Sequence, residues 1–377
     1  IKHGGRYFVK RNGSTLCAFV VPSKNPVAAR VAASHTDSPG FKLKPNAEFQ
    51  KEGMTMFGVE IYGAPILTSW LNRDLGIAGR IVVQHQGKVV EKLVNCFDAP
   101  LVIPQLAIHL DRNVNESGPI LNKQEHLAAL AALDQRDGYL EKLLKKQINY
   151  QRLLGFDLFL YPLEKANLLG SDQEMVAAYR IDSLGSVHAI LQGFLQTVKP
   201  HNNLLKMIVF WDHEEIGSTS YQGAGSPFLP HVIERILMAL NLSREDYFRM
   251  LSASRCASVD LAHATHPNYS DKHEPRHLAL MNQGIVIKSN AQQRYSSDAL
   301  SSGMIMDLCQ RNKIPFQYYV SRGDQPCGST IGPVNANRTG MLTIDIGCAQ
   351  LSMHSARELA GTKDHIYMAN LIQVFME

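Results

Sequence analysis

The stretch Val27-Ala-Ala-Arg-Val-Ala-Ala-Ser-His35-Thr-Asp37 places two polar side chains directly after an apolar run. Residues 27–34 have the composition of a strand that is mostly buried inside a parallel sheet. Open α/β sheets bind their ligands beyond the carboxyl ends of such strands, which is where His35 and Asp37 lie. The stretch therefore predicts an α/β fold with a polar site at one edge of the sheet.

The same pattern recurs along the chain, where other apolar segments precede acidic residues or histidine. Leu204–Trp211 reads as a buried strand that leads into Glu214-Glu215. Ala257–Asp260 ends on a carboxylate, and Met341–Ala349 precedes His354. Helical patterns lie between these strands, at Ser183–Val198, Pro230–Leu240 and Ser297–Arg311, the last of which opens with a Ser-Ser-Asp capping signal. This alternation predicts helices on both faces of the sheet.

Residues 41–175 follow a different pattern. Ile77–Val83 and Lys88–Leu93 flank a Gln-Gly pair and predict a β-hairpin. Two more strands and one amphipathic helix are expected at Leu101–Leu110, Phe156–Tyr161 and His126–Ile148. We therefore expect residues 41–175 to form a β-rich domain, inserted into a domain that comprises residues 1–40 and 176–377.

The 377 residues carry a formal net charge of +4, and the basic residues are dispersed. Lys142, Lys145 and Lys146 form the densest basic group, which we interpret as the solvated face of a helix. We therefore expect no nucleic-acid partner.

Cysteine spacing and hydropathy bear on the compartment. The six cysteines form no Cys-x-x-Cys pair, which favours free thiols in a cytoplasmic protein over a disulfide framework. The sequence shows no signal-peptide pattern and no apolar span long enough to cross a membrane. It begins at Ile1 in the middle of a pattern, and the sequence does not tell whether the native N-terminus is present.

His35 and Asp37 point to the same side of an extended segment, because successive side chains alternate. A histidine can bind a metal through one nitrogen while a carboxylate accepts the proton of the other. The alternative is a surface pair or a buried histidine without a ligand role.

Glu214 and Glu215 are adjacent carboxylates that repel each other unless a cation lies between them. A solvated loop would tolerate the pair. A metal ligand beside a general base requires such a pair, since one carboxylate holds the ion and the other reaches a water molecule.

Three further residues complete a possible two-metal set, in which one carboxylate bridges two ions. Asp182 has the alternative interpretation of a helix cap, and His354 that of an ordinary histidine. Asp260 precedes His263 and His266, which we interpret as pocket lining rather than as rival ligands. The hypothesis therefore rests on the whole set.

Five motifs occur in the order seen in the M18 family of metallopeptidases, the aspartyl aminopeptidases, which this chain resembles over essentially its whole length. They are His-Thr-Asp-Ser-Pro, Tyr-Arg-Ile-Asp-Ser, Asp-His-Glu-Glu-Ile-Gly-Ser, Ser-Val-Asp-Leu-Ala-His-Ala and Met-His-Ser-Ala-Arg-Glu. Trp70–Leu75, Gln105–Leu110 and Lys288–Tyr295 also resemble the family. The departures are Asp182-Ser183 for the family's Asp-Asn and Asn290–Gln293 for its Asn-Ala-Asn-Gln, and neither removes a charged ligand.

The resemblance implies two divalent metal ions per subunit, most simply zinc. Glu214 is the implied general base, and Asp37 the residue that orients His35. The implied ligands are Asp182 as the bridge, His35 with Asp260 on one ion, and Glu215 with His354 on the other.

The resemblance also implies a zinc-peptidase α/β sandwich with an inserted dimerisation domain, whose dimers assemble into a tetrahedral dodecamer. The implied activity removes N-terminal Asp or Glu from peptides. Lys288, with Arg294 as runner-up, would bind the acidic side chain, and His109 would reach the active site of a neighbouring subunit. The alternatives are a carboxypeptidase or deacylase on the same core, or a metal-binding scaffold without activity.

Overall fold

The computed structural model describes residues 1–377, and the chain divides into two compact units. Unit 2 comprises Ser38–Ala166 and His354–Arg357, and unit 1 comprises the rest of the chain. Unit 2 thus begins at Ser38 rather than at residue 41 and ends at Ala166 rather than at 175. The later part of the predicted insertion falls in unit 1 because Met175–Ala178 pairs with Glu358–Gly361 there.

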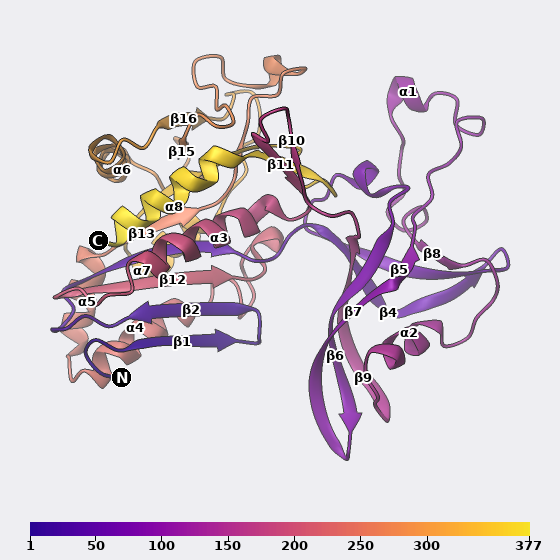
Figure 1. The fold of residues 1–377 in the computed structure, drawn as a ribbon, viewed down its shortest axis with the longest axis horizontal. Coiled ribbons are helices and arrows are strands. Elements are labelled where there is room, and N and C mark those ends of the chain that lie inside the picture. The colour runs from indigo at the N-terminus through magenta and orange to yellow at the C-terminus, as the bar shows by residue number, and fades with distance from the viewer. The chain divides into compact units, whose positions relative to one another are not determined.

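Unit 1 is built on a sheet of eight strands with the order β1-β2-β12-β3-β13-β17-β15-β16 (Figure 1). In that order the strands are Arg6–Arg11, Thr15–Val20, Leu204–Trp211, Ala28–His35, Arg255–Val259, Leu342–Gly347, Ile285–Ser289 and Phe316–Val320. The four strands β12, β3, β13 and β17 are parallel neighbours. Their carboxyl ends therefore meet at one edge, as the apolar runs predicted.

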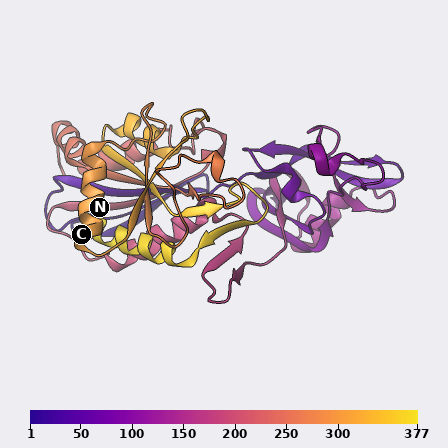
Figure 2. The ribbon, with the colours of Figure 1, turned by 90° about the horizontal axis from the view of Figure 1, so that it is seen from above.

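Helices cover both faces of this sheet, which confirms the α/β prediction (Figures 1 and 2). On one face α4 (Phe228–Ala239), α5 (Arg244–Ala253) and α7 (Ile331–Thr339) share a core with the strands. On the other face the core includes α3 (Ile181–Gln196), α6 (Ala299–Arg311) and α8 (Thr362–Met376). Every residue of β12 is buried, because the strand is shielded on both sides. Asp298 caps α6 as the Ser-Ser-Asp signal predicted.

A second sheet in unit 1 has the strand order β10-β11-β19-β18-β14. In that order the strands are Asn167–Leu169, Met175–Ala178, Glu358–Gly361, Ala349–Leu351 and Ala262–His263. It joins the segments that follow β13 and β17 to the segment that precedes α3.

Unit 2 contains a six-stranded sheet with the order β7-β6-β9-β4-β5-β8. In that order the strands are Lys88–Leu101, Leu75–His85, Arg152–Pro162, Gly40–Lys51, Met54–Tyr62 and Ala129–Ala132. The predicted hairpin is confirmed, and its turn residues Gln86 and Gly87 have φ of 49° and 74°. Positive φ at both positions matches the twist of the flanking strands.

Two predictions within unit 2 are wrong. Residues 126–148 do not form one helix, because Ala129–Ala132 pairs with β5 as strand β8 and only Tyr139–Gln147 is helical, as α2. No strand continues to residue 110, since β7 ends at Leu101 and is followed by a single bridge at Val102. The short helix α1 (Val114–Ser117) follows in this segment.

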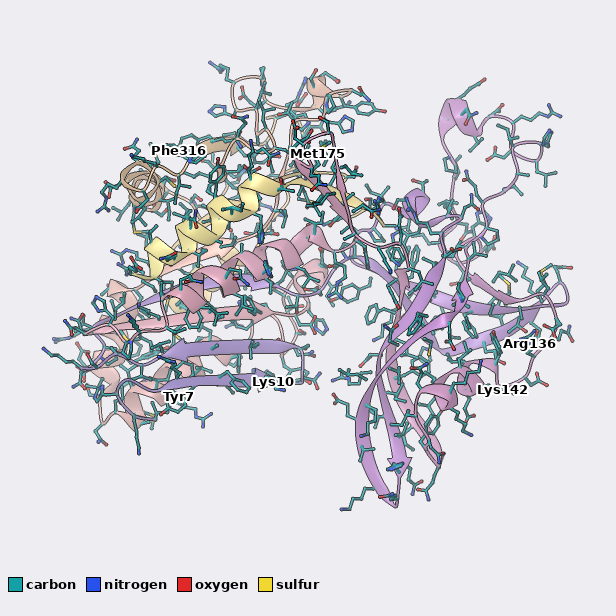
Figure 3. All side chains as sticks on the ribbon, viewed as in Figure 1. Tyr7, Lys10, Arg136, Lys142, Met175 and Phe316 are labelled. Carbon is teal, nitrogen blue, oxygen red and sulfur yellow. The ribbon has the colours of Figure 1, made fainter.

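The basic group on α2 lies on the solvent side of that helix. Lys142, Lys145 and Lys146 are exposed, while Leu143 and Leu144 are buried (Figure 3, where Lys142 is labelled). This arrangement matches the interpretation as a solvated helix face. All six cysteines are free thiols, and no helix combines the length and apolar character needed to cross a membrane.

Close packing of α3 against α8 depends on Gly193. A Cβ atom there would stand 2.5 Å from the carbonyl oxygen of Ala369 and 2.9 Å from the backbone nitrogen of Gln373. We expect Gly193→Ala to lower the free energy of unfolding by about 1–3 kcal/mol, because two packed helices must separate. Denaturant unfolding measures the change.

Gly303 provides the matched control, because it lies inside helix α6 with no atom within 4 Å of an added Cβ. Gly303→Ala should raise stability by roughly 0.5–1 kcal/mol through helix propensity alone. Equal effects of the two substitutions would show that α3 and α8 do not need the close approach.

Candidate metal centre

The candidate ligands of unit 1 collect at the carboxyl edge of three adjacent parallel strands. His35 is the last residue of β3, and Asp260 follows β13 directly. Glu214 and Glu215 follow β12 in a short 3-10 turn, Glu214–Ile216. Because β3 lies between β12 and β13, the three polar ends converge around His35.

His35 is buried among carboxylates. Its Nε2 atom lies 3.3 Å from Asp182 Oδ1 and 3.3 Å from Asp260 Oδ1, and its Nδ1 atom lies 3.4 Å from Asp37 Oδ1. Burial works to lower the pKa of His35, but hydrogen bonds to these three carboxylates raise it well above its ordinary value. An imidazole in this position strongly attracts a cation, either a proton or a metal ion.

His35, Asp182 and Glu215 each offer a ligand atom, and the three atoms lie within 4.8 Å of one another. Nitrogen and carboxylate oxygen are the donors that zinc takes at about 2.0–2.2 Å. His35 and Asp182 are buried, and Glu215 is half-buried. The donor chemistry, the spacing and the burial therefore fit a zinc ion.

A hydrogen bond to its backbone amide fixes the position of Asp182. Its amide donates to Glu358 Oε2 at 2.9 Å, and Glu358 is itself buried. Asp182 has non-helical dihedral angles and lies at a kink in the first turn of α3. The peptide bond from Asp182 to Ser183 is cis. The Asp182 carboxylate approaches His35, with Oδ1 3.3 Å from His35 Nε2.

Asp37 organises more of the site than the sequence indicated. Besides approaching His35, its carboxylate accepts the amide of Glu214 at 3.1 Å and the amide of Glu215 at 3.0 Å. One side chain therefore fixes both the histidine at the end of β3 and the glutamate turn after β12. Sequence spacing carried no signal for these two amide bonds.

Glu214 is half-buried beside the same carboxylates. Burial raises the pKa of Glu214 to about 7, and the charges of Asp260, Asp182 and Asp37 add to the rise, while His35 opposes it. A carboxyl group with a pKa near neutrality can both accept and donate a proton.

Lys288 at the end of β15 lies inside the cluster. It is only 2% exposed, and its Nζ atom is 3.6 Å from Asp260 Oδ2 and 5.4 Å from the ring centre of Tyr295. The alternative of a surface lysine on a strand edge is therefore wrong. Arg294 is exposed instead, and its Nε donates to the carbonyl oxygen of Cys327 at 3.3 Å.

The sequence singles out four further histidines. His354 belongs to unit 2, where its Nδ1 atom lies 3.1 Å from the carbonyl oxygen of Ala64, and His109 is an exposed residue of the same unit. In unit 1, the His263 ring lies against Tyr319 with 6.0 Å between ring centres. The His266 amide donates to the ring of His273 at 3.0 Å.

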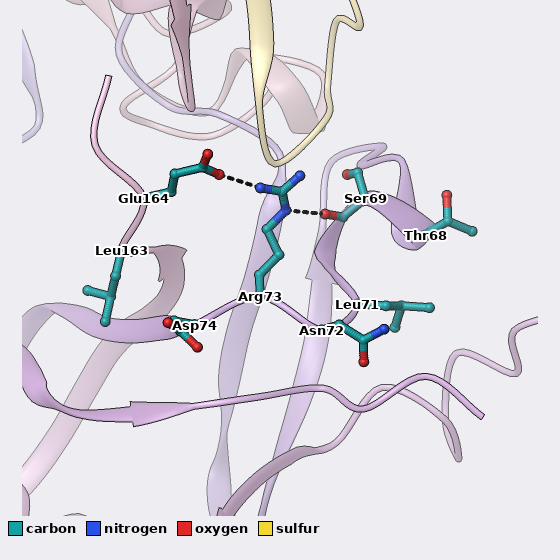
Figure 4. Close-up of a pocket in the computed structure, with 8 residues that line it drawn as sticks. All are labelled: Thr68, Ser69, Leu71, Asn72, Arg73, Asp74, Leu163 and Glu164. Atoms are coloured by element: carbon teal, nitrogen blue, oxygen red, sulfur yellow. Dashed lines mark hydrogen bonds and ion pairs between the residues drawn. The ribbon is translucent and has the colours of Figure 1, made fainter. Parts of the chain in front are cut away.

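A cavity of about 600 Å³ lies within unit 2 (Figure 4). In it Arg73 extends between Glu164, with which it forms an ion pair, and the carbonyl oxygen of Ser69. None of the candidate ligands lines this cavity. Arg73 and Glu164 are already paired with each other, so the cluster around His35 is the stronger candidate for chemistry.

Comparison with known proteins identifies the family. The family model for Aminopeptidase I zinc metalloprotease (M18) matches residues 1–376. A probable M18 family aminopeptidase 2 from Clostridium novyi is 40% identical over 387 residues, which cover 100% of this chain and 88% of the relative.

Solved structures agree with this assignment. A cryo-EM structure of the Ape4 and Nbr1 complex gives a TM-score of 0.94 at 36% identity, covering 100% of this chain and 77% of the other. The S. cerevisiae mApe1 dodecamer gives a TM-score of 0.85 at 27% identity, covering 99% and 85%.

The chain belongs to the M18 family and is an aminopeptidase of the zinc metallopeptidase class. The resemblance is confirmed, and so is the α/β fold of this family. Family membership speaks against a carboxypeptidase, a deacylase or an inactive scaffold.

The charge of the cluster predicts that metal stabilises the fold. Chelation should lower the melting temperature at neutral pH, because several carboxylates then face one another without a divalent ion. An ion present at 100 times its dissociation constant contributes about 2.7 kcal/mol to the folded state. Calorimetry with chelator, then with zinc restored, measures the shift. An unchanged melting temperature after proven metal removal would contradict the assignment.

Proposed function

We propose that this chain removes acidic N-terminal residues from peptides at a centre of two divalent ions, most simply zinc. Three donors within 4.8 Å, from His35, Asp182 and Glu215, carry the proposal. Asp182 would bridge the ions, Asp260 would join His35, and His354 would join Glu215. Unit 1 would act as the catalytic domain, and unit 2, which contains most of residues 41–175, would act as the dimerisation domain.

Zinc bound there would lower the pKa of water and polarise the carbonyl group of the scissile peptide bond. Glu214 would take the proton from the attacking water and then give it to the leaving amine. Two features of its surroundings prepare Glu214 for this role. Asp37 holds its backbone amide, and burial among the carboxylates raises its pKa to about 7. Asp37 also keeps the His35 ring in place.

The roles of Glu214 and Asp182 predict different losses. Glu214→Gln should retain the metal yet lose roughly 10²–10⁴ in turnover, because the amide cannot accept a proton. Asp182→Ala should lose metal, because the remaining donors offset less of the charge on the ions. Metal analysis after gel filtration and hydrolysis of an Asp-terminated dipeptide separate the two. Wild-type turnover by metal-loaded Glu214→Gln would contradict the role of Glu214 as general base. Two ions bound to Asp182→Ala would contradict the role of Asp182 as bridging ligand.

A buried cation beside the cluster supports a preference for acidic residues. Lys288 has one ion-pair partner, Asp260, at 3.6 Å, which is longer than a direct hydrogen bond. Its ammonium group carries three donors, so a substrate carboxylate can share it. A desolvated carboxylate without such a partner would cost several kcal/mol.

We expect Lys288→Ala to lower kcat/KM for Asp and Glu substrates relative to Leu substrates by roughly 1–3 kcal/mol. The Leu substrate reports any general damage to the centre through Asp260, so the ratio isolates specificity. Arg294→Ala is the comparison variant. An unchanged ratio in Lys288→Ala, with a changed ratio in Arg294→Ala, would assign the role to Arg294.

Large apolar side chains on the surface of unit 2 support self-association. Ile120 is 87% exposed, Leu93 82%, Leu133 79% and Leu110 74%. Exposed apolar side chains mark contact surfaces where they gather into one patch. Together with the dodecamer known for the S. cerevisiae relative, they favour dimers that assemble further, with His109 contributing to a neighbour's active site and contacting the substrate carbonyl oxygen.

Subunit mixing tests this role of His109. His109→Ala and Glu214→Gln should each be poorly active alone. A mixture that is dissociated and reassembled should recover part of the turnover, because some active sites then combine an intact Glu214 from one subunit with an intact His109 from its neighbour. Unmixed samples taken through the same cycle are the control. A fully active monomer would contradict the role of His109.

A further inference from the structure

Two histidines face each other across the contact between α3 and α8, which lie side by side on one face of the unit 1 sheet (Figures 1 and 2). His188 Nδ1 on α3 lies 2.9 Å from His365 Nε2 on α8. The rings stack with 4.9 Å between their centres and an angle of 24°. His188 is exposed and His365 is half-buried, so solvent can reach the pair.

The other ring contacts of both imidazoles are to uncharged groups. His188 Nε2 lies 3.4 Å from Gln192 Nε2, an amide that can only donate, and His365 bonds to the backbone of Gly185. Neither ring is paired with a carboxylate. The nearby Asp364 carboxylate instead accepts the amides of Asn282 and Gly284. Burial, followed by the neighbouring His188, lowers the pKa of His365, which keeps its lone pair available near neutral pH.

We propose that His188 and His365 form a second metal site, for a late first-row divalent cation such as Ni²⁺, Cu²⁺ or Zn²⁺. Imidazole is a favoured ligand of these ions. Two nitrogens bound at about 2.0–2.1 Å and at a right angle would be roughly 2.9 Å apart, which the pair already matches. The ion would replace the proton between the rings, which moves from His188 Nδ1 to His188 Nε2 as the Gln192 amide turns to accept it. The hydrogen bond from His365 to the Gly185 backbone resembles the contact that usually orients a metal-binding histidine.

This site shares no residue with the cluster around His35. It has two neutral ligands where the cluster has several carboxylates, so it fills only after the cluster is saturated. An ion held there ties α3 to α8 and stabilises unit 1 in proportion to its occupancy. Because α3 also carries Asp182 in its first turn, the ion would lie on a helix that reaches the cluster.

The test uses the full chain, saturated with zinc and freed of excess metal, and titrates it with Ni²⁺. Calorimetry counts binding sites, metal analysis checks that zinc stays bound, and the melting temperature reports stabilisation. We expect one Ni²⁺ site per chain and a rise in melting temperature. His188→Ala and His365→Ala should each weaken Ni²⁺ binding at least tenfold and abolish the rise, while the hydrolysis rate without Ni²⁺ stays unchanged.

His231→Ala is the matched control, because His231 is a helical histidine on α4, away from the pair. It should bind Ni²⁺ as the wild type does. Equal Ni²⁺ binding by wild type, His188→Ala and His365→Ala would overturn the proposal, as would a wild type that binds no Ni²⁺ while its zinc is retained. Neither result bears on the proposed peptidase, whose activity is measured separately.

Discussion

Negative charge concentrated at one edge of a parallel sheet is the constraint on which the rest of unit 1 depends. Asp37, Asp182 and Asp260 all approach the single buried ring of His35, and Glu214 and Glu215 are tied to Asp37 through their amides. Carboxylates this close repel unless a cation compensates them. The ammonium group of Lys288 supplies part of that charge, and a cation on His35, either a proton or a divalent metal ion, supplies more.

The fold keeps these groups together through contacts well away from the chemistry. The parallel order of β12, β3 and β13 brings three strand ends to one edge. Asp182 comes from a different direction, at the start of α3, and its position depends on Glu358 and on the packing of α3 against α8 at Gly193. The position of the ligand Asp182 thus depends on the packing of two helices. The His188–His365 pair lies within the same helix contact.

The sequence predicts those parts of this arrangement that follow from strand patterns. Apolar runs before His35 and Glu214 indicated buried strands and the edge where their side chains meet. The sequence could not predict that Asp37 would hold two amides of the glutamate turn, or that Lys288 would be buried against Asp260, because both contacts join distant segments. The prediction of one helix at residues 126–148 is wrong because Ala129–Ala132 pairs with β5, and that strand pairing outweighs the helix propensity of Ala and Leu.

Locating zinc directly in crystals would establish whether the cluster around His35 is the metal centre. Diffraction data collected on both sides of the zinc absorption edge would show where the ions bind. We expect anomalous peaks about 2.0–2.2 Å from the ligand atoms of His35, Asp182 and Glu215. Zinc-containing, active crystals with no anomalous peak beside these three side chains would contradict the assignment.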